Sequence, residues 1–231
     1  MRAIFHSFDS IEASEVLIIS GDAAHHLNVV RVKAGEKIII LNGKGIKLGG
    51  EVKVITKNLV EIFVSSKEVL ERGHELSLAI ANPKKDAFED ILKMAVELGI
   101  KDIYPMSSEF SQYDYVESDR VQRILESALI QSNNPFFPII HEQVKLSDFL
   151  NTYQDTLVFF NSKTSEGPAS NLKDLYKKTI LIGPEGGFSP SEVSLILKFS
   201  KIHEIHLPTP ILRAPTAVAS SVGYLLAGQN S

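Results

Sequence analysis

The sequence lacks cysteine entirely and carries no strong excess of charge of either sign. The absence of cysteine excludes a disulfide framework, a thiolate metal site and a cysteine nucleophile, and it fits a reducing compartment. The 24 Lys and Arg are outnumbered by 28 Asp and Glu, for a formal net charge of -4. The overall composition therefore does not indicate a nucleic-acid-binding protein.

Long apolar runs are also missing. The first ten residues, MRAIFHSFDS, have no apolar core behind a basic head and so do not indicate a secretory signal, and no run is long enough to span a bilayer. Apolar residues still make up 44% of the 231 residues, enough for a sizeable core and for two compact domains. We expect a soluble, cytoplasmic protein with no membrane contact.

The first part of the chain has the pattern of β-structure. Short runs rich in Val and Ile are separated by turn signals, and Asn42–Gly43 favours a tight hairpin. One short helical turn is expected near residues 25–30. The pattern predicts a small β-barrel domain over residues 1–72. The four runs are VLIIS, KIIILN, GEVKVI and LVEIFVS.

From residue 73 onward, strand and helix patterns alternate. Helices are predicted over residues 86–98 and 118–131, each with apolar residues at helical spacing, and a last one follows residue 214. Apolar strand runs lie between them: ELSLAIAN, IKDIYP, TLVFF, TILIG and a run near Ile205. This alternation predicts an α/β domain with a parallel sheet over residues 73–231.

A glycine-rich segment, IGPEGGFSPSE (residues 182–192), joins a buried strand to a helix. Ser189 and Glu192 have the spacing of a capping box, and Pro190 falls at the first helical position. The glycines before them allow close approach of the backbone to a ligand, and the carboxyl end of a parallel strand is where such sheets bind ligands. A tight turn without a ligand is the alternative, since neither dinucleotide nor P-loop spacing is present.

A second segment, LPTPILRAPTA (residues 207–217), leads into a stretch without charge that extends from Ala214 to Ser231. A helix of this kind is buried, either under its own domain or against a second subunit. Arg213 stands at its start, where its guanidinium suits a carboxylate or phosphate. A plain surface salt bridge is the alternative.

Basic residues gather in one part of the chain. Residues 25–60 contain seven Lys or Arg and only two Glu. This indicates either a solvated, lysine-rich surface or a phosphate-binding face, and the sequence leaves both open. The adjacent His25 and His26 point in different directions on any regular element. With no HExxH motif, no Ser-His-Asp spacing and no acidic cluster, we expect no metal site.

Four segments, taken in order, resemble the RsmE-type family, the small-subunit ribosomal RNA uridine-N3 methyltransferases of the SPOUT class. Besides the two segments above, they are AHHLNVVRVKAGEKI and FEDILKMAVELGIKDIYPMSSE. The resemblance extends along nearly the whole chain. It implies a PUA-like, RNA-binding barrel followed by a SPOUT-like parallel sheet with a C-terminal trefoil knot. It also implies S-adenosyl-L-methionine as cofactor, a homodimer, and 16S rRNA in the small ribosomal subunit as substrate.

The resemblance also assigns roles to residues. For the cofactor it implies Phe160, Asn161, Gly183, Glu185, Gly186, Gly187, Leu207, Ile211, Leu212 and Thr216. For RNA it implies His26, Arg31, Lys33 and Lys84. Arg213 is the expected catalytic residue, stabilising the developing uridinate or holding the cofactor carboxylate. No side chain stands out as the base that removes the N3 proton.

Some positions depart from the family pattern. Phe110 stands where the family has Arg, Pro208 and Pro210 where Gly and Arg are usual, and Pro215 where Glu is usual. The stretch at residues 130–134 also differs. Two alternatives therefore stay open: a methyltransferase of the same class with another RNA target, and a non-catalytic RNA-binding or assembly protein that retains the fold.

Overall fold

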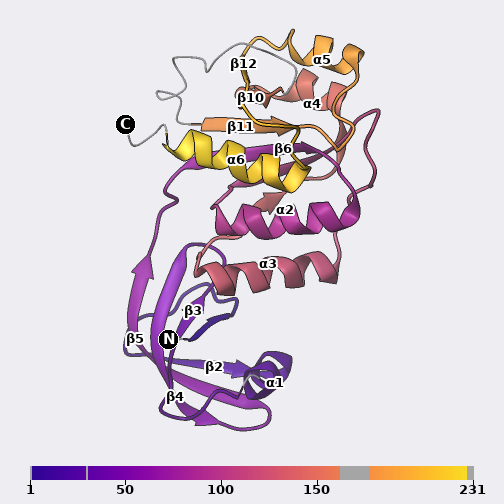
Figure 1. Cartoon of the computed structure of the whole chain (residues 1–231). Helices are drawn as coiled ribbons and strands as arrows, with labels where there is room; N and C mark the ends of the chain where they lie inside the picture. The colour runs from indigo at the N-terminus through magenta and orange to yellow at the C-terminus, as the bar shows by residue number, and fades with distance from the viewer. Residues whose placement is uncertain (1, 30, 162–176, 228–231) are drawn as a thin grey trace. The chain divides into compact units, whose positions relative to one another are not determined.

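The computed structural model describes residues 2–29, 31–161 and 177–227, apart from the side chains of Asp22 and His26. The chain divides into two compact units, shown in Figure 1. The first comprises Met1–Arg72 with Glu126–Phe137, and the second Gly73–Leu125 with Pro138–Ser231. Each unit is described by itself below.

The first unit is built on a five-stranded sheet in the order β1-β3-β4-β5-β2. All its strand pairs are antiparallel except β1 with β3, which is parallel. Register shifts between Gly49 and Gly50 and between Val52 and Val54 bend β4, as β-bulges do. The elements are β1 (Arg2–Phe5), β2 (Val16–Ser20), α1 (Gly21–Val29), β3 (Lys37–Leu41), β4 (Ile46–Ile55) and β5 (Leu59–Val69).

Two local expectations for this unit differ in detail from the structure. The predicted hairpin at Asn42–Gly43 forms, with a loop of residues 42–45 between the end of β3 at Leu41 and the start of β4 at Ile46. The Asn42 side chain accepts hydrogen bonds from the backbone N–H groups of Lys44 and Ile46, at 2.9 and 2.8 Å, and this widens the loop. The expected single helical turn is a longer helix, α1, that starts already at Gly21.

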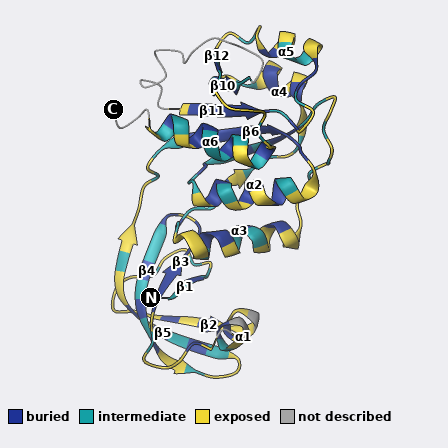
Figure 2. Cartoon of the chain, viewed as in Figure 1, coloured by how far each residue is buried: buried dark blue, intermediate teal, exposed yellow. Residues whose placement is uncertain are grey.

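The second unit contains a parallel sheet, which confirms the predicted α/β fold. Its strands follow the order β12-β10-β11-β6-β7-β8, with β9 also paired to β7, and every pair is parallel. The central strands are apolar and buried, dark blue in Figure 2. The strands are β6 (Glu75–Ala81), β7 (Asp102–Ser107), β8 (Ile139–Ile140), β9 (Val144–Lys145), β10 (Thr156–Phe160), β11 (Lys177–Ile182) and β12 (Ile202–Ile205).

The helices that accompany these strands are α2 (Lys85–Glu97), α4 (Leu146–Thr152), α5 (Pro190–Ile196) and α6 (Ala214–Ala227), and α3 (Asp119–Ser132) begins in this unit and ends in the first. Gly99, with a φ of +72°, follows α2 and adopts the left-handed conformation that commonly ends a helix. The short α4 was not predicted, because seven residues give little periodicity to detect. The final four residues of the predicted last helix lie outside the described residues.

Alternate residues of the parallel strands face different helices, because side chains along a strand alternate between its two faces. On one face, Phe159 of β10 packs in a cluster with α4 and α5. On the other, the ring of Phe160 meets that of Tyr224 on α6. Figure 1 shows α2 and α6 together on this second face. The sheet is therefore covered on both sides.

The strand order decides where the two motif segments meet. In the sheet, β10 lies between β11 and β12, and all three run in the same direction. The loops that follow them, after Phe160, Ile182 and Ile205, therefore emerge at the same edge. The glycine-rich segment and the segment before α6 become neighbours there. The trefoil knot stays a prediction.

Candidate functional site

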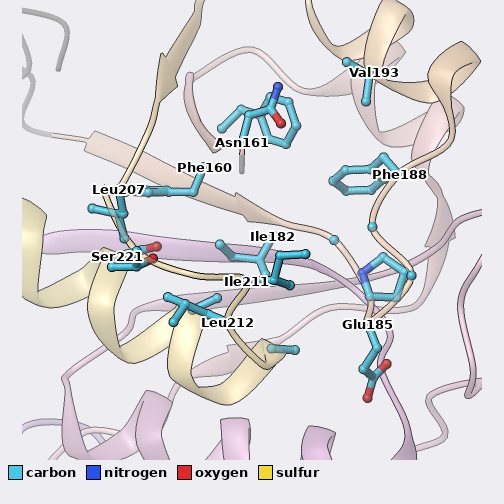
Figure 3. Close-up of a pocket in the computed structure, with 18 of the residues that line it drawn as sticks. Phe160, Asn161, Ile182, Glu185, Phe188, Val193, Leu207, Ile211, Leu212 and Ser221 are labelled. Carbon is cyan, nitrogen blue, oxygen red and sulfur yellow. The ribbon is translucent and has the colours of Figure 1, made fainter. Parts of the chain in front are cut away.

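A pocket opens at the carboxyl ends of β10, β11 and β12, and α6 closes one side (Figure 3). Its volume is about 220 Å³. Three loop segments and two helices, α5 and α6, supply the walls. The residues that line it are Phe159, Phe160, Asn161, Ile182, Gly183, Pro184, Glu185, Gly186, Gly187, Phe188, Val193, Leu207, Thr209, Pro210, Ile211, Leu212, Ala214, Ala217 and Ser221.

The glycine-rich loop forms the first wall, and two of its glycines are required by their surroundings. Gly187 has a φ of +71° and donates its backbone N–H to the carbonyl of Pro184 at 2.8 Å, which closes a tight turn. At Gly186, a Cβ atom would come within 3.1 Å of the Phe110 Cβ. The loop thus follows a path that a side chain at either position would disturb.

The capping box predicted from the sequence holds the exit of this loop. Ser189 Oγ accepts from the Glu192 backbone N–H at 3.3 Å, and Glu192 Oε2 accepts from the Ser189 N–H at 2.9 Å. The other carboxylate oxygen of Glu192 accepts from the backbone N–H of Glu109 at 2.8 Å. One side chain therefore fixes both the start of α5 and the loop that carries Phe110.

The end of β10 forms a second wall, and hydrogen bonds fix it to β12. The Asn161 backbone N–H donates to the carbonyl of Ile205 at 3.0 Å, and its side-chain amide donates to Glu204 at 2.6 Å. These bonds hold Phe160 and Asn161 beside the segment that follows β12. That segment, with Leu207, Ile211 and Leu212, forms the third wall.

The pocket is largely apolar, with acidic rather than basic character. None of the described lining residues is Lys, Arg or His. Its charged group is the exposed carboxylate of Glu185, which also accepts from the Lys84 backbone N–H at 3.2 Å. Ile211 is 87% exposed at the rim. Such a lining suits a neutral or positively charged organic ligand better than a phosphate.

The structure brings together all of the residues that the sequence assigned to the cofactor except Thr216. Thr216 is exposed on the first turn of α6 and does not line the pocket. Arg213 is also exposed and outside the lining, and its carbonyl accepts from the Ala217 N–H at 2.8 Å. Arg213 therefore stands immediately before the N-terminal end of α6.

None of the described residues assigned to RNA lines this pocket, although the backbone of Lys84 contacts the lining residue Glu185. Arg31 and Lys33 are exposed in the first unit, where Arg31 has a φ of +59°. Lys84 is exposed at the start of α2 in the second unit. The side chain of His26 lies outside the described residues. The structure does not bring these four together within one unit.

Several lysines of the basic segment are paired with carboxylates. Lys53 lies 2.7 Å from Glu51 and Lys44 lies 3.0 Å from Asp9. Both pairs are solvent-exposed, so they lower the local positive charge while adding little stability. Part of the segment is therefore a solvated surface, and Arg31 and Lys33 are the better candidates for phosphate contacts.

Sequence reasoning missed several lining residues. Ala214, Ala217 and Ser221 recur at helical spacing along one side of α6, a pattern that could have been found once the helix was predicted. Phe188 and Val193 gave no such signal, because only the packing of α5 directs them to the pocket. Among these missed residues, Ser221 has a buried hydroxyl without a hydrogen-bond partner among the described residues.

Within residues 2–29, 31–161 and 177–227, no cluster of three or more His, Asp or Glu could hold a metal ion. In the same described parts of the chain, no helix combines the length and apolar character that crossing a membrane requires.

The fold and the pocket define a class: a two-unit protein in which a small β-unit accompanies an α/β domain that binds its ligand at the carboxyl edge of a parallel sheet. Family profiles agree with this description. One described as an RNA methyltransferase domain matches residues 71–226, and one described as an RNA methyltransferase PUA domain matches residues 19–65. The chain therefore belongs to this family of RNA methyltransferases.

Relatives of this chain carry consistent names. Ribosomal RNA small subunit methyltransferase E from Rickettsia conorii is 28% identical over 93% of this chain and 90% of its own length. The protein of the same name from Aquifex aeolicus is 27% identical over 96% and 99%.

Solved structures share the fold. The ribosomal RNA small subunit methyltransferase E from Neisseria gonorrhoeae, bound to S-adenosyl methionine, superposes with a TM-score of 0.88 at 21% identity, covering 98% of this chain and 97% of that one. A probable rRNA-methyltransferase from Porphyromonas gingivalis gives 0.79 at 24% identity, covering 100% and 99%.

Proposed function

We propose that this protein transfers a methyl group from S-adenosylmethionine to N3 of a uridine in the 16S rRNA of the small ribosomal subunit. The observation that carries the proposal is the pocket itself. Residues far apart in the sequence, singled out by their resemblance to one family, line a single cavity at the carboxyl edge of the sheet. The names of the relatives support ribosomal RNA as the substrate.

The lining residues fit this cofactor. Apolar walls from Phe160, Leu207 and Leu212 suit a flat heterocycle, and a described lining without basic side chains suits a ligand that carries a positive charge. The buried hydroxyl of Ser221, which has no partner among the described residues, offers one polar contact. When bound, S-adenosylmethionine supplies a methyl group activated by its sulfonium.

The chain's own residues then have three tasks. The glycine-rich loop lets the cofactor approach the backbone closely, since Gly186 and Gly187 present no side chain to it. The apolar walls exclude water from the reacting atoms. Arg213, at the N-terminal end of α6, stabilises the negative charge that forms on the uracil ring when the N3 proton leaves.

RNA recognition is assigned to both units. In this proposal, residues 1–72 act as a PUA-like RNA-binding domain through His26, Arg31 and Lys33, and residues 73–231 act as the methyltransferase domain with Lys84 at its RNA-facing edge.

Thr216 belongs to the rim of the cofactor site. The uncharged α6 supports a homodimer, because the half-exposed apolar residues Ala219 and Leu226 flank its buried stripe. The site of action is the cytoplasm, where ribosomal subunits are assembled.

The test uses purified protein, radiolabelled S-adenosylmethionine and small ribosomal subunits from cells that lack their own enzyme. After reaction, the rRNA is digested to nucleosides and separated. We expect label in 3-methyluridine. Label in a different nucleoside would contradict the N3 assignment, and absence of label with undiminished cofactor binding would favour a non-catalytic RNA-binding protein.

A second candidate is a methyltransferase of the same class that acts on another RNA. Phe110 supports it. This ring is 39% exposed beside Gly186, where the resembled family carries arginine. An aromatic ring at this place offers stacking in place of phosphate pairing. The same assay, repeated with total RNA, separates the two candidates by the RNA that becomes labelled.

A further inference from the structure

Ser221 has an unusual environment on α6. Its side chain is buried, and its Oγ has no hydrogen-bond partner among the described residues. In the described part of the chain, the other buried side-chain atom without a partner is Asn82 Oδ1, which does not belong to the pocket lining. Buried polar atoms in folded proteins are almost always paired, so this hydroxyl calls for a physical explanation.

The usual solution for a serine within a helix is not adopted here. Ser132 Oγ donates to the Ala128 carbonyl at 2.7 Å, and Ser194 Oγ donates to the Pro190 carbonyl at 2.8 Å. Both are bonds to the residue four positions earlier. The corresponding carbonyl for Ser221 is that of Ala217, and no such bond forms. The hydroxyl of Ser221 is therefore left available for another partner.

Among the described residues, the wall around Ser221 supplies no polar partner for its hydroxyl. Figure 3 shows Ser221 at the end of the pocket where Leu207 and Leu212 are also drawn, and Glu185 at the opposite end. The Ser221 end is thus apolar apart from this hydroxyl, whereas the Glu185 end is exposed and acidic. A flat heterocycle with a polar edge matches the first end, and a cationic group matches the second.

We propose that Ser221 Oγ hydrogen-bonds the polar edge of the adenine of the bound cofactor and so contributes to specificity for that base. The inference rests on the proposed function, because it takes S-adenosylmethionine as the ligand. A hydroxyl can both donate and accept, so it can pair with either a ring nitrogen or the amino group of the purine. Ser221 is then a binding residue that the sequence motifs do not include.

The proposal predicts two effects of opposite sign for Ser221→Ala. Without ligand, the variant removes an unpaired buried hydroxyl from a helix, so its melting temperature should rise by about 2–4 °C. With ligand, the purine edge loses its partner, so affinity should fall about tenfold. An unpaired serine with no role in binding would show the rise in melting temperature but no loss of affinity, so the affinity decides.

Calorimetric titrations with S-adenosylhomocysteine and 5′-methylthioadenosine test the assignment. The second compound keeps the adenine and ribose but lacks the amino acid portion. We expect Ser221→Ala to weaken both by the same factor. Ser220→Ala is the matched control: this half-exposed neighbour on the same helix does not line the pocket, and its variant should bind like the wild type.

The outcomes are separable. If wild-type protein binds neither compound, the proposed function itself fails. If wild-type protein binds both and Ser221→Ala binds them equally well, the inference alone fails. A reduction in affinity confined to S-adenosylhomocysteine would move the interaction to the amino acid portion and overturn the adenine assignment. So would a crystal structure of the complex with Ser221 Oγ beyond about 3.5 Å from every purine nitrogen.

Discussion

Gly186 shows how a single position links the loop to its surroundings. A Cβ placed there meets the side chain of Phe110 at 3.1 Å, closer than an ordinary van der Waals distance, and Phe110 sits on a loop that Glu192 holds. The glycine is therefore needed for packing, even though its φ is not in the left-handed region. The neighbouring Gly187, by contrast, is needed because its backbone has a positive φ, +71°, which other residues rarely adopt.

Gly186→Val should displace the glycine-rich loop and weaken binding of S-adenosylhomocysteine about tenfold or more, because overpacking shifts the wall of the pocket. Calorimetry measures the affinity, and circular dichroism checks that the fold is retained. Gly73→Val is the control, since a Cβ at Gly73 meets no atom within 4 Å. Equal affinities of Gly186→Val and wild type would disprove a role for this loop in binding.

Arg213 allows a second prediction at this scale. Its side chain is exposed and outside the pocket lining, so Arg213→Ala should leave cofactor affinity unchanged while lowering kcat about 10²–10³-fold. Single-turnover kinetics and calorimetry measure the two quantities. The exposed Arg123 of α3 provides the control variant Arg123→Ala. Unchanged turnover would refute catalysis by Arg213, and an equal reduction in cofactor affinity would assign it to the cofactor carboxylate.

At the scale of elements, α2 and α3 are joined by a bidentate ion pair. Arg120 Nε and Nη2 each lie 2.6 Å from a carboxylate oxygen of the nearly buried Glu89. These hydrogen bonds from Arg120 lower the pKa of Glu89 against the opposing effect of burial. Two helices that are separated along the chain are thus held in register by one charge-assisted interaction.

The pair should make stability depend on pH in a defined direction. Because the folded-state pKa of Glu89 is lowered, its contribution is present above the ordinary pKa of a free glutamate and disappears as pH falls through the lowered value. Glu89→Gln should therefore lower the melting temperature at pH 7, and the difference from wild type should vanish in strong acid.

Thermal unfolding followed at a series of pH values from 7 downward checks this dependence. Asp90→Asn is the control, because Asp90 pairs with Lys93 at 2.9 Å on the exposed side of the same helix. Its effect should be smaller at every pH. A Glu89→Gln deficit that persisted unchanged into strong acid would show that the ion pair is not its source.

At the scale of the whole molecule, the chain has a net charge of -4, whereas RNA is a polyanion. RNA binding therefore has to depend on local groups of positively charged side chains. Arg31 and Lys33 are exposed in the first unit, whereas several nearby lysines are neutralised by carboxylates. Long-range attraction from overall charge is therefore not expected, and RNA binding should depend on a small number of ion pairs with phosphates.

The double variant Arg31→Ala/Lys33→Ala should weaken rRNA binding and reduce the slope of log affinity against log salt by about 0.7 for each phosphate that is no longer neutralised. Filter binding over a range of salt concentrations measures the slope, and cofactor affinity should not change. Lys53→Ala serves as the control because Lys53 already pairs with Glu51. A slope identical to that of wild type would exclude these two residues from the RNA interface.

Much of the local structure was determined by the sequence itself. Apolar runs predicted five of the seven strands of the parallel sheet but not the two-residue strands β8 and β9. The spacing of Ser189 and Glu192 predicted a capping box that the structure contains. Gly99 marked the end of α2. Such signals depend on residues a few positions apart, so they act within one element and can be interpreted without knowledge of the rest of the chain.

The tertiary structure alone decided which of these elements became neighbours. The insertion of β10 between β11 and β12 brings two loops together into one pocket, yet strand order has no signal in local periodicity. The packing of Phe110 on Gly186 and the unpaired hydroxyl of Ser221 depend on segments that are many residues apart along the chain. Both features arise only when the two faces of the sheet are buried together, because that packing involves the whole domain at once.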